Sequence, residues 1–482
     1  MKPFAMAVML AVAGTPNPAA STDPALAILD QARGTPAEIF ADIAFRLLDG
    51  DKIPVKDRVS LLEEINLRAS EARDPLPLRP AVIAPVGGKP VMAAKGLGLH
   101  LDTLSIRCRV AQKLLALDGQ RARQRFADIA PPDTPKYDCQ SAVIADPTIY
   151  FETLAAVVAQ APFTAEEQKK QVPFWMVEGA VRGIRTSLEI IAAARNFPQL
   201  VHGEKEASAL AGAFGIALGI DDSNRNFTAA AQRTNLVGAV LAANDRLSSL
   251  GAPPQTMLAA LRGYLVRHMT AARCADSIVY DYAASVDAFH AALAKRTVPP
   301  PISDAEMQPA KSEGEADLGK PGDQASYREM AADVEALGPD RLPRTTTPIR
   351  PEIALQAHAV LAELAAWKGS ADQGAMEVFH QKAGFYAILM QRFLLSDIFP
   401  SIVSGFVATL RDGAILGASP RDWLSEVEVL QIRDTMTGAR TRNGVTEFYW
   451  ARTDEGAAPV MAASGFPALA AYGQLILLDR KY

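Results

Sequence analysis

Residues 267–277, RHMTAARCADS, place a histidine, two arginines, a cysteine and an aspartate close together, as a reactive thiolate site would require. A catalytic cysteine needs a basic partner that favours the thiolate. His268 precedes Cys274 by six residues, which on a helix puts the two side chains on roughly opposite sides. The spacing therefore argues against a Cys–His dyad. It favours the end of one helix, with Asp276 or Ser277 capping the next.

A second candidate for chemistry is a metal site. Glu377 and His380 form an E-x-x-H pair, the spacing used by carboxylate metal sites in helical bundles. If the chain turns back through residues 368–372, His358 on the preceding helix lies level with His380. His358, Glu377 and His380 are therefore candidate metal ligands. A di-metal site would need a second E-x-x-H pair, so the ligand count favours the alternative that both histidines are boundary residues satisfied by hydrogen bonds.

The chain has three cysteines, and an odd number in an exported protein suggests one disulfide and one spare thiol. Cys108 lies on an apolar stripe with Leu104 and Ala111, so we expect it to be buried. Cys139 and Cys274 lie in non-repetitive segments. The sequence therefore predicts a Cys139–Cys274 disulfide, with the other two pairings as alternatives.

The N-terminus predicts export. Lys2 precedes an apolar run over residues 4–13 and then small residues and prolines, the layout of a signal peptide spanning residues 1–21. An apolar tail is the alternative. The later apolar stretches 207–220 and 385–410 are too short or too interrupted to span a bilayer. We therefore expect a periplasmic or extracellular protein without a transmembrane segment after signal removal.

Composition and motifs exclude several function classes. Of the 482 residues, 49% are hydrophobic and 21% are charged, an ordinary globular balance, and the formal net charge is only −5. No basic run marks a nucleic-acid binder. The sequence contains no G-x-S-x-G elbow, no H-E-x-x-H or C-x-x-C motif, and no G-x-G-x-x-G before a helix. It therefore predicts no catalytic residue and no cofactor, and an enzyme is the less favoured class.

Helical signals recur along the whole chain. Apolar residues at helical spacing form many stripes; His268 falls on one with Leu258, Leu261 and Leu265, so we expect it to be partly buried. Capping boxes, in which Ser or Thr precedes Glu by three residues, are predicted at three helix starts. They are Thr35 with Glu38, Thr164 with Glu167, and Ser303 with Glu306. The sequence therefore predicts an all-α fold.

The expected organisation is two helical domains. They span residues 22–298 and 327–482, with a proline-rich acidic linker at 299–326 between them and an extended loop at 73–98. No fixed repeat period is present. We expect an irregular array of antiparallel helix pairs, either α-solenoid-like or a multi-helix bundle, with a second, smaller helical domain.

These features favour a non-enzymatic helical scaffold that presents a surface to another protein or envelope component. One alternative is a metal-binding protein or enzyme around His358, Glu377 and His380. Another is a periplasmic ligand-binding protein with a concave helical groove and tryptophans as stacking platforms. Those tryptophans are Trp175, Trp367, Trp423 and Trp450.

Overall fold

The computed structural model describes most of the chain. The described residues are 23–80, 98–135, 143–219, 236–270, 282–293, 299–306, 325–337, 350–370, 373–394, 396–431, 435–442, 445–451 and 453–479. Helices dominate these residues, so the all-α prediction is confirmed. The predicted signal peptide, Cys139 and Cys274 lie outside the described residues.

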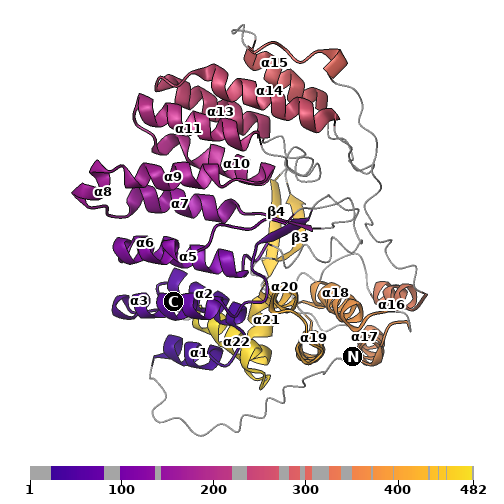
Figure 1. Ribbon diagram of the computed structural model, residues 1–482. Helices are drawn as coiled ribbons and strands as arrows, with labels where there is room; N and C mark the ends of the chain where they lie inside the picture. The colour runs from indigo at the N-terminus through magenta and orange to yellow at the C-terminus, as the bar shows by residue number, and fades with distance from the viewer. Residues whose placement is uncertain are drawn as a thin grey trace, which may run out of the picture.

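The first two thirds of the chain form a stack of helices (Figure 1). Its helices are α1 (Pro24–Ala32), α2 (Ala37–Asp49), α3 (Val55–Ala69), α5 (Thr103–Leu115), α6 (Gly119–Ala127), α7 (Thr148–Gln160), α8 (Ala165–Lys169), α9 (Val172–Arg182), α10 (Ser187–Asn196), α11 (Glu204–Ala217), α13 (Leu236–Ser249), α14 (Pro254–Thr270) and α15 (Tyr282–Leu293). In one row, α5, α7, α10, α13 and α15 contact each other in that order, and in a second row α9, α11 and α14 do the same. Contacts between neighbouring layers are those of a solenoid.

The layers of this stack have unequal lengths in sequence. The helices of the first row begin at residues 103, 148, 187, 236 and 282. A pair of short antiparallel strands, β1 (Leu78–Pro80) and β2 (Val143–Ala145), adds to this irregularity, because it joins the segment before α5 to the segment before α7. The irregular spacing explains why no repeat period is visible in the sequence.

The last part of the chain is also mainly helical. Its elements are α16 (Ala325–Ala336), α17 (Pro351–Ala366), α18 (Ala375–Phe393), α19 (Phe399–Ile415), α20 (Pro420–Val427), β3 (Thr435–Arg442), β4 (Val445–Ala451), α21 (Thr453–Ala462) and α22 (Pro467–Asp479). Short 3-10 turns lie after α10 at Pro198–Leu200, before α16 at Asp304–Glu306 and after α20 at Glu428–Gln431. The antiparallel pair β3–β4 was not predicted. The dipeptide Asn443-Gly444 between the two strands is the sequence signal that would have indicated a hairpin.

The hydrophobic core of the described residues falls into two clusters, divided differently from the expected domains. The first cluster combines α1–α3 with α16–α22, and the second contains α7–α15. Figure 1 shows α22 beside α1 and α2, and α20 beside α2. The expected boundaries at 298 and 327 therefore do not separate the two cores, because the C-terminal helices bury apolar surface against the first helices.

Helix α5 is the wall between the two clusters. One of its faces belongs to the first cluster and the opposite face to the second, as its 3.6-residue period allows. The residues on these faces are Ile106, Val110 and Leu114 for the first, and Leu104, Cys108 and Ala111 for the second. The predicted stripe through Cys108 is thus the face that packs against the rest of the stack.

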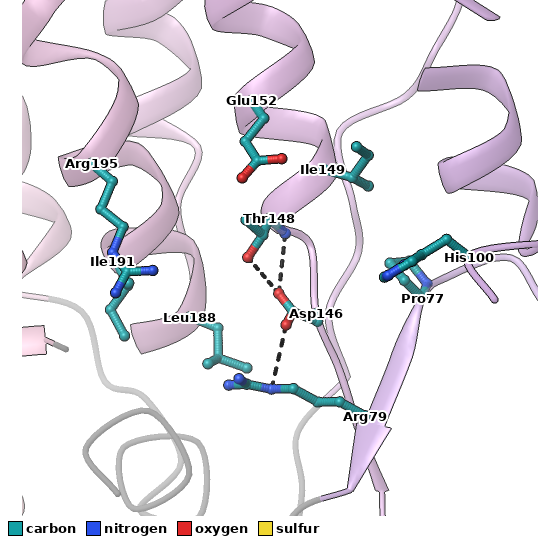
Figure 2. Close-up of a pocket in the computed structure, with 10 residues that line it drawn as sticks. All are labelled: Pro77, Arg79, His100, Asp146, Thr148, Ile149, Glu152, Leu188, Ile191 and Arg195. Atoms are coloured by element: carbon teal, nitrogen blue, oxygen red, sulfur yellow. Dashed lines mark hydrogen bonds and ion pairs between the residues drawn. The ribbon is translucent and has the colours of Figure 1, made fainter. Parts of the chain in front are cut away.

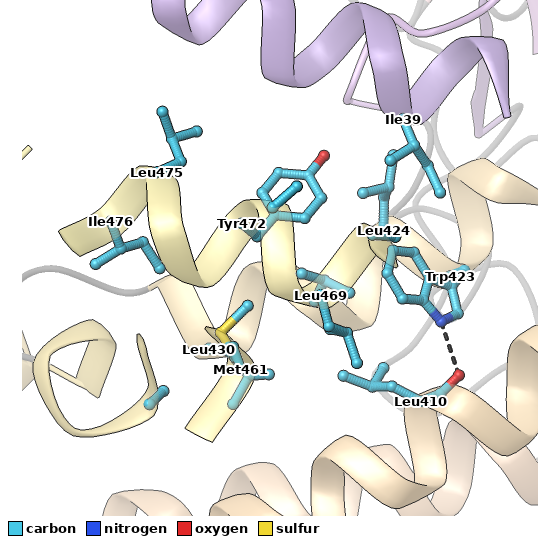
Figure 3. Packing of buried hydrophobic residues seen from close by; sticks show 14 of the residues in the cluster. Ile39, Leu410, Trp423, Leu424, Leu430, Met461, Leu469, Tyr472, Leu475 and Ile476 are labelled. Atoms are coloured by element: carbon cyan, nitrogen blue, oxygen red, sulfur yellow. Dashed lines mark hydrogen bonds between the residues drawn. The ribbon is translucent and has the colours of Figure 1, made fainter. Parts of the chain in front are cut away.

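The first and last described helices pack tightly against each other where α22 meets α1 and α2, a contact that we call the joint (Figure 3). Helix α22 contacts α1, α2 and α21, and Leu469 and Tyr472 on it are fully buried. A Cβ at Gly473 would lie 2.4 Å from the backbone nitrogen of Ala462, so α21 and α22 can approach this closely only with glycine there. The Trp423 indole nitrogen on α20 donates to a backbone carbonyl of α19 at 2.8 Å.

The capping predictions have mixed outcomes. The capping box of Thr164 and Glu167 at α8 is confirmed. The box at Thr35 is wrong: α2 begins at Ala37, and the Thr35 hydroxyl donates to a carbonyl of the preceding turn. The Glu38 carboxylate accepts instead from the backbone nitrogen of Arg73 at 3.0 Å, and so tethers the chain after α3.

Replacing Leu469 with alanine tests the joint. A large-to-small change at a fully buried site costs about 2–5 kcal/mol. Because α1 and α2 share the cluster, we expect amide hydrogen exchange to accelerate there as well as in α21 and α22.

The control is Leu210→Ala on α11, an equally buried leucine of the second cluster. It should affect exchange mainly in α9 and α14, which contact α11. Unchanged exchange in α1 and α2 of the Leu469→Ala variant would contradict a shared core.

Candidate functional site

The three candidate metal ligands do not form a metal-binding group. Within the described residues, no set of three or more His, Cys, Asp or Glu side chains is placed to hold a metal ion. His358 is exposed on α17, and its Nδ1 contacts the carbonyl oxygen of Ala354 in the same helix at 2.7 Å. The Nδ1 of His380 on α18 lies 2.9 Å from the Glu426 carboxylate of α20. Glu377 accepts from the Gln381 amide one turn later on α18, at 3.5 Å.

The reason for this separation is the packing order of the helices. The main helix contacts of α17 are with α16 and α19, whereas α18 packs on α19. Ala357 and Leu364 occupy the buried face of α17, which leaves His358 outside. His380 follows the buried Phe379 and connects α18 to α20, where Glu426 is 1% exposed. It therefore serves the core of the C-terminal helices.

Of the other residues singled out by sequence, Cys108, His268 and Trp423 are core groups. Cys108 is buried and forms no disulfide with any residue that the structure describes, and burial raises the pKa of its thiol to about 12. His268 is buried against the ring of Tyr264, as its stripe predicted. Trp423 is buried, whereas Trp175 on α9 is 53% exposed. These histidine and cysteine side chains give no indication of catalysis.

A polar cavity lies where the β1–β2 pair meets α7 and α10 (Figure 2). Its volume is about 380 Å³, within the range of small-molecule pockets. Five ionisable side chains line it, and they come from four separate parts of the chain. They are Arg79 on β1, His100 before α5, Asp146 after β2, Glu152 on α7 and Arg195 on α10.

The floor of this cavity is a fixed polar cluster. Asp146 accepts hydrogen bonds from the backbone nitrogen and the hydroxyl of Thr148, and so caps the start of α7. Its other oxygen lies 3.6 Å from the Nε of Arg79, whose side chain is 13% exposed. The Asp146 carboxylate is thus already engaged on both oxygens, and it fixes the strand pair against the helix.

Helical spacing explains which side chains of α7 and α10 form the walls of the cavity. On α10, Leu188, Ile191 and Arg195 recur at three- and four-residue intervals and therefore share one face. On α7, Glu152 lies one turn beyond Thr148. Figure 2 shows these two helix faces on either side of the cavity, with Glu152 and Arg195 at its rim and Asp146 and Arg79 at its floor.

The two charged side chains at the rim, Glu152 and Arg195, do not form an ion pair with each other. Glu152 and Arg195 are exposed and face the same cavity, yet they form no ion pair with any described residue. Burial raises the pKa of Glu152, and the nearby negative charge of Asp146 raises it further, against the opposite effects of Arg195 and His100. His100 adopts a φ of 51°, a left-handed conformation that residues with a Cβ rarely adopt.

Sequence reasoning missed this site because its residues are far apart along the chain. The Asp146-Pro147 dipeptide was recognised only as a helix start, which the structure confirms. Arg79 lies within the segment predicted to be an extended loop. No short motif links Arg79 to Glu152 or Arg195: the β1–β2 pairing brings Arg79 beside the start of α7, and the packing of α10 on α7 brings Arg195 beside Glu152.

Two further cavities have different linings: one is mainly apolar, and the other is lined by charged groups that include Arg46 and Asp49, which already form ion pairs with other residues. One of about 310 Å³ is mainly apolar and lies among Tyr150, Phe151 and Met176. The other, of about 510 Å³, lies at the joint beside Arg46 and Tyr472. Within the described residues, no helix is long and apolar enough to cross a membrane.

Replacing Glu152 with glutamine should stabilise the protein in a pH-dependent way. The folded state raises the pKa of this carboxyl, so its charge costs stability above the ordinary glutamate value of 4.5. We expect a higher Tm for the variant near neutral pH, and this gain should vanish as pH falls to about 3, well below the ordinary value, where both folded and unfolded states bind the proton.

Thermal unfolding at the two pH values measures the effect. Glu166→Gln on α8 is the matched control, because Glu166 is an exposed carboxylate paired only with Lys170. A Glu152→Gln gain that is equal at both pH values would contradict a role for the charge.

Cys108 should resist alkylation in the folded protein. Its raised pKa keeps the thiol protonated, and its side chain is fully buried. We expect iodoacetamide to modify Cys108 at mildly alkaline pH only after unfolding in guanidinium, as peptide mass mapping would show. Rapid modification under native conditions would contradict this environment. The same map without reductant tests the predicted Cys139–Cys274 disulfide.

Similarity to known proteins gives no assignment. Any functional proposal for this chain must therefore depend on its own residues and geometry. Comparisons with protein-family models, with curated proteins and with solved structures find no significant match.

Proposed function

We propose that this protein is an exported, non-enzymatic helical scaffold that binds another protein or an envelope component. The observation that carries the proposal is the solenoid-like stack from α3 to α15. Stacked helix pairs create an extended surface that a partner can follow, because each layer adds exposed side chains beside those of its neighbour.

The joint between the chain's ends supports a scaffold role. Since α22 packs on α1 and α2, the first layers are covered by the C-terminal helices instead of ending in solvent. Solenoids need such caps at their ends for solubility. The described core is thus a continuous support for the exposed surface of the stack.

The most suitable anchor for a partner is Trp175. It is 53% exposed, and the edge-on contact with Phe174, at 5.1 Å between ring centroids, orients its ring. It follows Gln171, whose φ of 55° makes a sharp corner between α8 and α9. Exposed tryptophans on rigid elements commonly dominate binding energy at protein interfaces.

Export is the second part of the proposal, and the signal-like order of residues 1–21 supports it. Cell fractionation combined with N-terminal sequencing would test it. A mature chain that starts near residue 21 in the exported fraction is the expected result. Retention of Met1 on a protein found only inside the cell would contradict it.

Site-specific photocrosslinking tests the scaffold proposal. A benzoylphenylalanine at position 175 should crosslink one defined partner in intact cells, and Trp175→Ala should weaken the purified complex about tenfold or more. The control position is Leu355 on α17, which is 74% exposed and outside the stack. Equal crosslinking at both positions, or none at 175, would count against this surface.

A second candidate function is binding of a small ligand. The specific observation is the cavity between α7 and α10, where Glu152 and Arg195 form no ion pair with a described residue and apolar side chains share the lining. The two functions are compatible, because the cavity and Trp175 lie on different helices.

A further inference from the structure

We propose that the cavity between α7 and α10 binds a small zwitterion of the amino-acid type. Its carboxylate would pair with Arg195, its ammonium group with Glu152, and its aliphatic part would contact Leu188 and Ile191. This inference deepens the second candidate function and rests on it.

The two opposite charges point to a ligand that carries both. Glu152 and Arg195 line one cavity from neighbouring helices, and neither forms an ion pair with a described residue. Elsewhere in the stack, arginines do pair across neighbouring elements, as Arg123 does with Glu167 at 3.0 Å. A guanidinium binds a carboxylate through two parallel hydrogen bonds, and a carboxylate accepts from an ammonium group.

The floor of the cavity directs the ammonium group to Glu152. Both Asp146 oxygens are engaged by Thr148 and Arg79, so this carboxylate contributes mainly negative potential. The carboxylates of Asp146 and Glu152 balance the guanidinium groups of Arg79 and Arg195 in the same cavity, so the lining suits a ligand with one charge of each sign better than a polyanion. Glu152 is therefore the side chain best placed to accept from the cation.

The size and lining of the cavity fit a molecule with a short aliphatic part. The volume of about 380 Å³ is at the low end for ligand pockets. Leu188 and Ile191 are buried on α10, and Pro77 is buried beside β1. These groups would exclude water from an aliphatic side chain and strengthen the charge pairs above them.

Binding should also change the ionisation of Glu152. Burial and Asp146 raise its pKa in the free protein, while Arg79, Arg195 and His100 are the cationic or titratable groups that share the cavity. An ammonium group beside Glu152 favours the charged form. Affinity should therefore fall as pH decreases toward the range in which Glu152 becomes protonated.

Calorimetry on the full mature chain tests the proposal with three matched probes. They are L-leucine, 4-methylpentanoate, which lacks the ammonium group, and 3-methylbutylamine, which lacks the carboxylate. We expect L-leucine to bind at least tenfold more tightly than either analogue. Arg195→Gln and Glu152→Gln should each weaken L-leucine binding about tenfold or more, because each removes a charged hydrogen bond.

Arg246→Gln on α13 is the matched control, because Arg246 is exposed and lies outside the cavity lining. It should leave L-leucine affinity unchanged. Absence of binding by L-leucine, L-valine and L-alanyl-L-leucine alike would overturn the proposal, as would equal affinity for the single-charge analogues. Circular dichroism of each variant confirms folding. Crosslinking at position 175 is read separately, so loss of one function does not imply loss of the other.

Discussion

The packing of α22 between α1 and α21 is the constraint on which the rest of the structure depends. It joins residues more than 400 positions apart, and it requires glycine at position 473 because the α21 backbone approaches so closely. This contact fixes α2, α2 contacts α3, and α3 contacts α5. Each further layer of the stack then builds on a fixed first layer. The cavity depends on this order as well, since β1 follows α3 and pairs with the strand that leads into α7.

A polar contact determines how α22 lies on α2 within an otherwise apolar joint. The Tyr472 hydroxyl donates to Asp42 at 2.7 Å, and the Arg46 Nε lies 2.9 Å from the same carboxylate. Burial raises the pKa of Tyr472 well above its ordinary value, and the charge of Asp42 adds to this. Apolar surfaces can slide over one another at little cost, whereas a buried donor that loses its acceptor is expensive. The contact therefore selects one register of α22, and with it one position of the C-terminal helices.

The sequence predicted the local features well and the long-range ones poorly. Stripes at helical spacing identified the all-α fold and the burial of Cys108 and His268, because burial of one helix face needs only the 3.6-residue period. The Thr35 capping box failed because the competing partner of Glu38 lies at Arg73, beyond the reach of a local rule. The two cores and the cavity were missed for a related reason. Both depend on contacts between distant segments, α22 with α1 and β1 with β2, that no periodicity encodes.

The cavity also differs energetically from the joint. At the joint, polar groups are buried and paired, so they add specificity to a stable contact. At the cavity rim, Glu152 keeps a charge that the folded state disfavours, and the backbone of His100 adopts a rarely used conformation. Selection for stability alone would favour a neutral side chain at position 152, since the effects of Arg195 and His100 do not offset the burial and the charge of Asp146 that raise the pKa of Glu152. Sites at which local rules fail in this way tend to be functional. A ligand that supplies a positive charge to Glu152 and a negative charge to Arg195 would explain why the folded protein keeps a charged side chain at position 152.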